Sequence, residues 1–385
     1  MTGPPGTPPS RCWTVAELSS DQPFGQTFSN LRRHSVSSWS NAAMTTERLQ
    51  TLHSVLDETD GRLKAGEAVA GEVWPSGFGS LDVALGGGFR SGELTLLGGP
   101  PGLGKTTLAL QVIRNLLAAH RHAVYFSYEH DTQSVLERLI VLEAAEIAGS
   151  NAVGLPRVRQ AFEARHGSSL TLEERLAGTE GGAEAVEALQ GYGPRLHVHR
   201  SSGAHTDVEA MRAVVEKIQE DTGQVPFVVV DYLQKVHVAS PAEERRRGPR
   251  MAEDDRVTVV VEGLKDMALE MVIPVLALVA VDKSGLDAGK RVRLRDLRGS
   301  SALAHEADVA LIMNDKFDVV ARHHLMYNLT NAETYREWVV ISIEKNRNGV
   351  DGVDLEFRKR FEHSRFDSDG ATVVEQLVDE RIFVG

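Results

Sequence analysis

Short runs of apolar residues recur from residue 94 onward, and charged or helix-forming segments separate most of them. The runs consist mainly of Val, Ile and Leu, a composition typical of strands that are covered on both faces of a parallel sheet. Their alternation with helical segments predicts an α/β fold, a mostly parallel central sheet flanked by helices, over residues 72–385. The charged segments 239–256 and 282–298 are predicted loops. The predicted strands are 94–97, 124–127, 196–199, 227–231, 273–281, 309–313 and 338–344.

The pattern before residue 72 is helical. Over residues 46–64 the large apolar side chains fall on one stripe of a helix, at Leu49, Leu52, Leu56 and Leu63. We expect a linker helix within residues 44–71, and its stripe packs either on its own domain or on a neighbouring subunit. Residues 1–43 are rich in turn-forming residues and lack periodicity, so they are predicted to be a disordered leader, with Met44 as an alternative start.

Composition narrows the class of protein. A chain of 385 residues with 42% hydrophobic and 25% charged residues can build a full-sized core. The longest apolar run, 272–281, contains Pro274 and is shorter than the roughly 20 residues of a spanning helix, so we expect no membrane contact. The single cysteine, Cys12, has no disulfide partner, and the first residues lack a secretory signal, which together predict a cytoplasmic protein. The net charge of −12 argues against a surface covered in positive potential.

The segment GGPPGLGKTT carries the clearest functional motif. It matches the phosphate-binding loop G-x-x-x-x-G-K-[ST] and lies between a predicted strand and a predicted helix, as the motif requires. Its glycines let backbone N–H groups surround phosphates, while Lys105 reaches the β- and γ-oxygens and Thr106 binds Mg²⁺. ATP and Mg²⁺ are therefore the predicted cofactors. The predicted nucleotide-binding residues are Gly99, Pro100, Pro101, Gly102, Leu103, Gly104, Lys105, Thr106 and Thr107.

Two carboxylates at the ends of predicted strands complete this site. Asp231 ends the apolar run 227–231 and is the predicted second magnesium residue, which would hold the ion through water. Glu129 follows the strand 124–127 and is the predicted base that orients the attacking water. The structural alternatives are a strand-capping Asp231 and a solvated Glu129 at the start of a helix.

From Gly77 to the C-terminus the chain resembles the RecA-like ATPase domain of the DnaB-type replicative helicases. The segments that carry the resemblance are PSGFGSLDVALGGGFRSGELTLLGG, YFSYEH, VVVDYLQKV, RLRDLRGSSALAHEADVALIM and IEKNRNGVDGVDLEFRKRFEHSRF. The resemblance implies a RecA-like P-loop NTPase core and a homo-oligomeric ring, expected to be a hexamer, in which ATP drives movement along single-stranded DNA.

The resemblance also assigns roles to basic residues. It places Lys345 and Arg347 in the nucleotide site of the neighbouring subunit, where a fixed guanidinium neutralises charge in the transition state. It singles out Arg298, with the backbone of Gly299 and Ser300, as a DNA contact. The basic run KRVRLRDLR, which contains Arg293 and Arg295, suits phosphate contacts along the same strand. Without the resemblance, an ordinary basic turn after a strand would be the favoured explanation of Lys345 and Arg347, and a solvated face that of the basic run.

Three departures from the family pattern keep other functions open. Ala280 occupies the position where the family usually has a glutamine that senses the γ-phosphate, and the DNA loop reads Arg-Gly-Ser-Ser instead of Arg-Glu-Ser-Gly. The family's N-terminal helical domain has no counterpart, so no primase contact is predicted. The main alternative is a RecA-, RadA- or KaiC-like ATPase that acts as a switch or scaffold in recombination, defence or signalling. A nucleotide-dependent oligomerisation module that never binds DNA is a further alternative.

Overall fold

The structure is a computed structural model that describes residues 51–66, 71–163, 169–238, 252–287, 289–326 and 333–380. The predicted leader and Leu49 lie outside the described residues. By its internal contacts the chain divides into two units, residues 1–69 and 70–385. Among the described residues, no helix combines the length and the apolar character that crossing a bilayer requires.

The first unit contains the predicted linker helix. Helix α2 (Leu52–Lys64) begins after Thr51, whose side-chain hydroxyl accepts a hydrogen bond from the Ser54 amide and so caps the helix. None of its residues is buried, and the apolar stripe at Leu52, Leu56 and Leu63 is exposed. The described part of the prediction is therefore confirmed as a helix, and the surface that its leucines contact stays a prediction.

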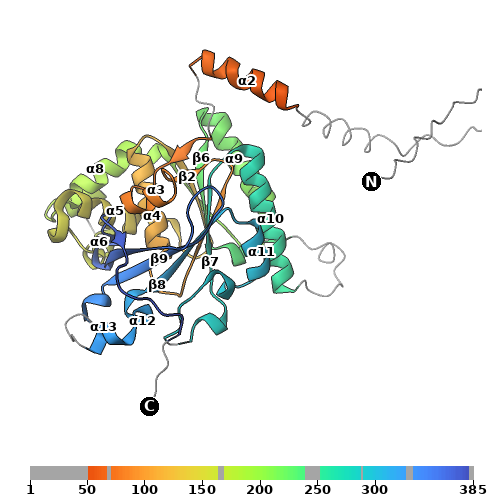
Figure 1. Cartoon of the computed structure of the whole chain (residues 1–385). Coiled ribbons are helices and arrows are strands. Elements are labelled where there is room, and N and C mark those ends of the chain that lie inside the picture. Colours follow the sequence, from red (N-terminus) through yellow and green to blue (C-terminus); the bar gives the residue numbers. More distant parts are fainter. Residues whose placement is uncertain are drawn as a thin grey trace, which may run out of the picture. The chain divides into compact units, whose positions relative to one another are not determined.

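The second unit is built on a ten-stranded sheet (Figure 1). Its order is β11-β10-β9-β8-β3-β7-β6-β4-β5, and β12 pairs with β10. The six strands from β8 to β5 in this order are mutually parallel. The remaining pairs are antiparallel: β9 with β8, β10 with β9, and both β11 and β12 with β10. The prediction of a mostly parallel sheet is therefore confirmed. The bounds are β3 (Leu94–Gly98), β4 (His122–Ser127), β5 (Leu196–Arg200), β6 (Pro226–Asp231), β7 (Val275–Val279), β8 (Val309–Asp315), β9 (Trp338–Asn346), β10 (Val353–Arg360), β11 (Arg365–Phe366) and β12 (Ala371–Thr372).

All of the predicted strands are present. The longest strand of the sheet that was not predicted is β10. In β10 the buried Leu355 and Phe357 alternate with partly exposed charged residues, because this antiparallel strand is apolar on one face only. Continuous apolar runs, the pattern used for the prediction, do not detect such a strand. A separate two-stranded sheet joins β1 (Val73–Trp74) to β2 (Phe89–Arg90).

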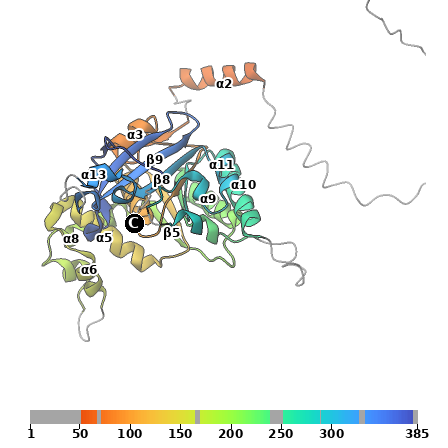
Figure 2. The same ribbon diagram turned by 60° about the horizontal axis from the view of Figure 1, so that its bottom comes forward.

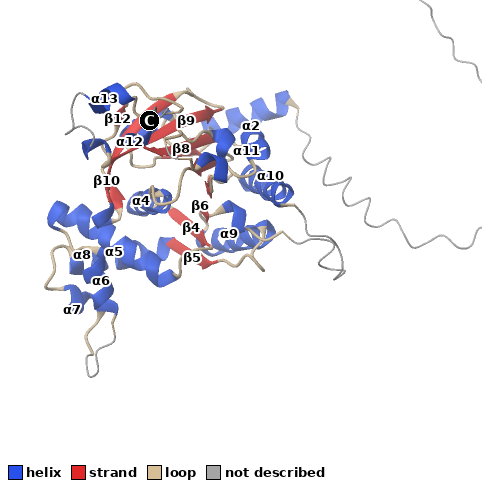
Figure 3. Cartoon of the chain, turned by 90° about the horizontal axis from the view of Figure 1, so that it is seen from below, coloured by secondary structure: helices blue, strands red, loops and turns tan. Residues whose placement is uncertain are grey.

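Helices cover both faces of the sheet. Figure 3 shows α4 (Lys105–Ala118) on one side of the strands, and α9 (Val208–Thr222) and α10 (Glu253–Met271) on the other. Within β3, Leu97 belongs to the α4 core while Leu94 and Leu96 belong to the α9–α10 core, the two-residue alternation of a strand. Each such leucine contributes about 1.5–3 kcal/mol when fully buried.

A further group of helices adds a third, smaller core. Figure 2 shows α5, α6 and α8 gathered at one side of the sheet, away from α9 and α10. Their buried side chains, among them Ile140, Val158 and Leu176, form a separate cluster. The helix bounds are α3 (Gly79–Ala84), α5 (Thr132–Ala148), α6 (Leu155–Phe162), α7 (Leu172–Leu176), α8 (Gly182–Tyr192), α11 (Ser300–Glu306), α12 (Lys316–Val319) and α13 (Arg322–Met326).

The predicted loop 239–256 is wrong at its C-terminal end, because α10 already begins at Glu253. Part of the charge that suggested a loop comes from Glu253, Asp254 and Asp255, which occupy the first turn of the helix. Acidic side chains are favourable there because they face the positive end of the helix dipole. Residues 239–251 of the predicted loop lie outside the described residues. The other predicted loop, 282–298, contains only the short turns η4 (Lys283–Gly285) and η5 (Leu294–Asp296) in its described part, and is confirmed.

Candidate functional site

The P-loop lies between β3 and α4, at the carboxyl ends of the parallel strands. Gly99, Gly102 and Gly104 all adopt positive φ angles, of 152°, 81° and 88°, which side-chain-bearing residues rarely do. A Cβ atom at Gly104 would lie 2.7 Å from Phe366 and 2.8 Å from Phe361. The backbone conformation therefore favours glycine at all three positions, and close packing adds a second requirement at Gly104.

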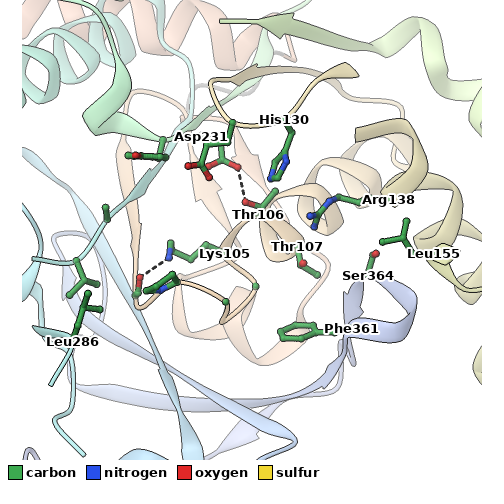
Figure 4. A pocket seen from close by; sticks show the side chains of 18 residues that line it. Lys105, Thr106, Thr107, His130, Arg138, Leu155, Asp231, Leu286, Phe361 and Ser364 are labelled. Atoms are coloured by element: carbon green, nitrogen blue, oxygen red, sulfur yellow. Dashed lines mark hydrogen bonds between the residues drawn. The ribbon is translucent and has the colours of Figure 1, made fainter. Parts of the chain in front are cut away.

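Lys105 folds back on the loop that carries it. Its Nζ donates to the carbonyl oxygens of Gly99, at 2.6 Å, and Pro100, at 3.0 Å (Figure 4). Burial lowers the pKa of Lys105, and the negative charges of Asp231 and Glu129 oppose that shift. The ammonium group thus lies in the cavity, held by neutral acceptors that phosphate oxygens can replace.

Asp231 and Thr106 meet across the site although 125 positions separate them in the sequence. The Thr106 hydroxyl donates to Asp231 Oδ2 at 2.7 Å, and the buried Tyr125 hydroxyl donates to the same oxygen at 2.7 Å. Asp231 is only 2% exposed, and burial raises its pKa against the effect of these two hydrogen bonds. Among the described residues, its side-chain donors are neutral hydroxyls.

These residues fit a magnesium ion. A buried carboxylate without a cationic partner is costly, and a carboxylate beside a hydroxyl supplies the oxygen ligands that Mg²⁺ prefers. Asp231 and Thr106 are the residues that would hold it, as expected from the sequence.

Glu129 lines the same cavity, two residues beyond the end of β4. Its carboxylate is 40% exposed and forms an ion pair with Lys235, 3.4 Å from Oε1 to Nζ. Glu129 also contributes to the electrostatic environment of both Lys105 and Asp231, so the three charged groups share one site.

The cavity has a volume of about 620 Å³, and its outer wall contains residues that the sequence analysis did not assign to it. Figure 4 shows Arg138, Leu155, Phe361 and Ser364 beyond the phosphate loop. Phe361 packs edge-to-face on Phe366, with ring centroids 5.5 Å apart. These residues come from α5, α6 and the segment after β10, so no local motif connects them. An apolar and aromatic wall of this kind suits a nucleobase.

Lys345 and Arg347 lie level with the amino ends of the parallel strands, at the edge of the sheet opposite to the phosphate loop, which follows the carboxyl end of β3. The register pairs Asn346 with Val309 and Val309 with Thr95, near the amino end of β3. The Lys345 ammonium donates to the carbonyls of Ala304, at 2.7 Å, and His305, at 3.2 Å.

The Arg347 guanidinium also donates to His305 O, and it lies 3.5 Å from the Asp308 carboxylate. The Asp308 carboxylate in turn accepts hydrogen bonds from Lys265 Nζ at 2.6 Å and from the Leu94 amide at 2.8 Å. A single buried acid therefore anchors Arg347 to the start of the sheet.

The predicted DNA residues divide into two groups. Arg298, exposed, pairs with Glu253, and Gly299 (φ 83°) and Ser300 follow it at the start of α11. Arg295 is exposed and lines the same polar hollow as Arg298 and Gly299.

Arg293, in contrast, is held by two carboxylates. It lies 3.0 Å from Glu344 and forms a second ion pair with Asp379. In this arrangement its charge is already neutralised within the chain.

The comparisons with known proteins agree with this geometry. The family model described as "DnaB-like helicase C terminal domain" matches residues 74–368. The chain is 26% identical to the replicative DNA helicase DnaB of Treponema pallidum, over 72% of this chain and 52% of that protein. It is 28% identical to DnaB of Rhodothermus marinus, over 74% of this chain and 28% of that protein. The chain thus spans about half or less of the length of these relatives.

Among solved structures, the fold is similar to that of a DnaB-like replicative helicase whose interactions with primase have been described. The TM-score is 0.62 at 20% identity, and the match covers 86% of this chain and 70% of that chain. The family model covers the P-loop, both acidic residues, the predicted DNA residues and the two basic residues at the opposite edge. On this evidence, the chain belongs to the DnaB-like helicase C-terminal domain family.

Proposed function

We propose that this chain is a subunit of a cytoplasmic, ring-shaped ATPase, a homo-hexamer that uses ATP and Mg²⁺ to move along single-stranded DNA and separate duplex strands. The observation that carries the proposal is the separation of Lys345 and Arg347 from the chain's own phosphate loop. A site whose cations lie at the far edge of the sheet is completed by a second subunit. Head-to-tail contacts of this kind form a ring when the rotation between successive subunits closes.

The sheet register sets the scale of that separation. Arg347 lies level with Leu94, since its amide bonds to Asp308 O and Asp308 bonds to the Leu94 amide. The phosphate loop starts at Gly99, five residues further along β3, which at about 3.3 Å per residue is about 16 Å. The Arg347 side chain also points to the carbonyl of His305. This separation supports a role of Arg347 at a neighbour's nucleotide instead of its own.

Within one subunit the described residues divide the chemistry. Lys105 would exchange its two carbonyl partners for phosphate oxygens, and Thr106 and Asp231 would hold the metal. When bound, Mg²⁺ neutralises charge that develops on the transferred phosphoryl group. Glu129, the exposed carboxylate, would accept a proton from the attacking water, and Arg347 of a neighbouring subunit would stabilise the transition state.

All of the predicted DNA residues remain candidates, and their expected contributions to DNA binding differ because their partners within the chain differ. Arg295 and Arg298 are exposed, and a phosphate that binds Arg298 has to displace one exposed carboxylate, that of Glu253. Arg293 would first have to leave Glu344 and Asp379, so it contributes less.

The test is strand displacement on a forked duplex, measured together with the ATPase rate as a function of protein concentration. A ring whose sites form between subunits hydrolyses ATP with a rate per subunit that rises with concentration, is stimulated by single-stranded DNA, and separates the fork. Concentration-independent hydrolysis with no DNA effect would contradict the proposal.

A second candidate function is a switch or scaffold ATPase that leaves duplexes intact. It is favoured by Ala280, which lines the nucleotide cavity but has no polar side chain with which to sense a γ-phosphate. ATP hydrolysis that is stimulated by DNA without strand displacement would identify this function.

A further inference from the structure

The turn η3 (Leu233–Lys235) lies between the predicted DNA contact at Arg298 and the predicted base Glu129. It begins two residues after Asp231. Gln234 and Lys235 are adjacent in this turn, yet their side chains reach different partners, one at the backbone of Arg298 and one at Glu129.

The Gln234 side chain ties the end of β7 to the predicted DNA contact. Its Oε1 accepts the Ala280 amide at 3.1 Å, and its Nε2 lies 3.5 Å from Ala280 O and 3.3 Å from Arg298 O. The Arg298 amide also donates to Ala280 O at 3.1 Å. Any displacement of Arg298 by a bound phosphate therefore acts directly on the Gln234 amide. The two contacts made by Nε2 are long, so they can be exchanged at little cost.

The neighbouring Lys235 holds the predicted base. Its ammonium lies 3.4 Å from Glu129 Oε1 and 5.1 Å from the centre of the Tyr232 ring. The attraction between the two opposite charges holds the Glu129 carboxylate beside the turn. The pair also draws Glu129 towards the turn and away from free rotation in the cavity.

We propose that Lys235 restrains Glu129 until single-stranded DNA binds, and that Gln234 transmits the binding event. DNA on Arg298 shifts the Gln234 contacts, the turn moves, and Glu129 is released to activate water. This inference rests on the proposed function, since it needs DNA to bind at Arg298. Lys235 and Gln234 are positioning residues, because they act on hydrolysis through Glu129.

The first test is the variant Lys235→Met. Both side chains of the pair are about 40% exposed, 41% for Lys235 and 40% for Glu129, and exposed ion pairs are weak, so its loss should raise the basal ATPase rate by about two- to fivefold. The rise should be in kcat, with KM for ATP unchanged, and the stimulation by DNA should fall by the same factor. Lys235→Arg should restore wild-type behaviour. A basal rate that stays the same or falls would overturn the proposal.

The second test measures DNA binding without nucleotide. Coupling is reciprocal, so a variant that frees Glu129 must also favour the DNA-engaged form. The Kd of Lys235→Met for a fluorescent thymidine oligonucleotide should therefore decrease by about two- to fivefold. In a Gln234→Met background the same substitution should leave Kd unchanged, because the connection is missing. Equal tightening in both backgrounds would exclude Gln234 as the link.

A matched control separates these effects from a general loss of charge. Lys217 forms a comparable exposed ion pair with Asp221, at 2.7 Å, on α9, and Lys217→Met should change neither rate nor Kd. If the wild-type protein itself neither binds single-stranded DNA nor is stimulated by it, the proposed function fails. If the wild-type protein is stimulated and Lys235→Met keeps the same stimulation, only the restraint on Glu129 fails.

Discussion

Replacing Arg347 by alanine should leave ATP binding intact and slow ATP hydrolysis by about 10³- to 10⁵-fold, the range measured for arginine residues that complete a phosphoryl-transfer site. ATP binding should survive because Arg347 is offset from the phosphate loop of its own chain by about 16 Å along the strand direction, as the strand rise implies. Hydrolysis should be lost because the missing guanidinium acts on the nucleotide of the next subunit.

The variant should also fold. The Arg347 side chain is 48% exposed, and its ion pair with Asp308 is long, at 3.5 Å. Asp308 keeps its hydrogen bonds from Lys265 and the Leu94 amide when Arg347 is removed, so no buried charge is left unpaired. The free energy of unfolding should therefore fall by no more than about 1 kcal/mol.

The assay mixes Arg347→Ala subunits with Lys105→Ala subunits, which cannot bind ATP productively, under conditions in which subunits exchange. Random head-to-tail rings of an equal mixture place an intact phosphate loop beside an intact Arg347 at about one quarter of the interfaces. The mixture should then recover up to about one quarter of the wild-type rate, whereas each variant alone is inactive. A mixture that stays as inactive as its components would refute the assignment of Arg347 to the neighbouring site.

Four further outcomes are expected. Glu129→Gln should bind ATP, measured by nucleotide retention, but not hydrolyse it, because the amide cannot accept a proton. Asp231→Asn should raise Tm of the nucleotide-free protein at neutral pH, because burial raises the Asp231 pKa and its charged form is costly there; the gain should shrink as pH falls below that raised pKa and vanish below the ordinary pKa of an aspartate. Arg298→Ala should reduce the slope of log K for single-stranded DNA against log salt by about 0.7. Deleting residues 1–66, but not 1–43, should reduce the number of subunits per oligomer, obtained by dividing the mass from sedimentation by the mass of the shortened chain; an unchanged number would leave α2 without a role in assembly.

The sequence by itself determined the parts whose information is local. The phosphate loop could be recognised because Gly99, Gly104 and Lys105 must be contiguous with a strand and a helix to form it. The buried strands could be found because strands covered on both faces need continuous apolar runs. Strand β10, apolar on one face, and the acidic first turn of α10 were missed because a local pattern of mixed polarity also describes a loop.

Only the tertiary structure decided which distant residues meet. It brought Thr106 to Asp231, assembled the outer wall of the cavity, and showed that Arg293 already has acidic partners inside the chain. It also placed Arg347 at the edge of the sheet opposite the phosphate loop, where the sequence supplied only a resemblance. The physical reason is that strand order and register depend on the packing of the whole sheet. The order β8-β3-β7-β6-β4 sets the distances between charges that lie more than a hundred residues apart, and no local pattern of residues encodes that order.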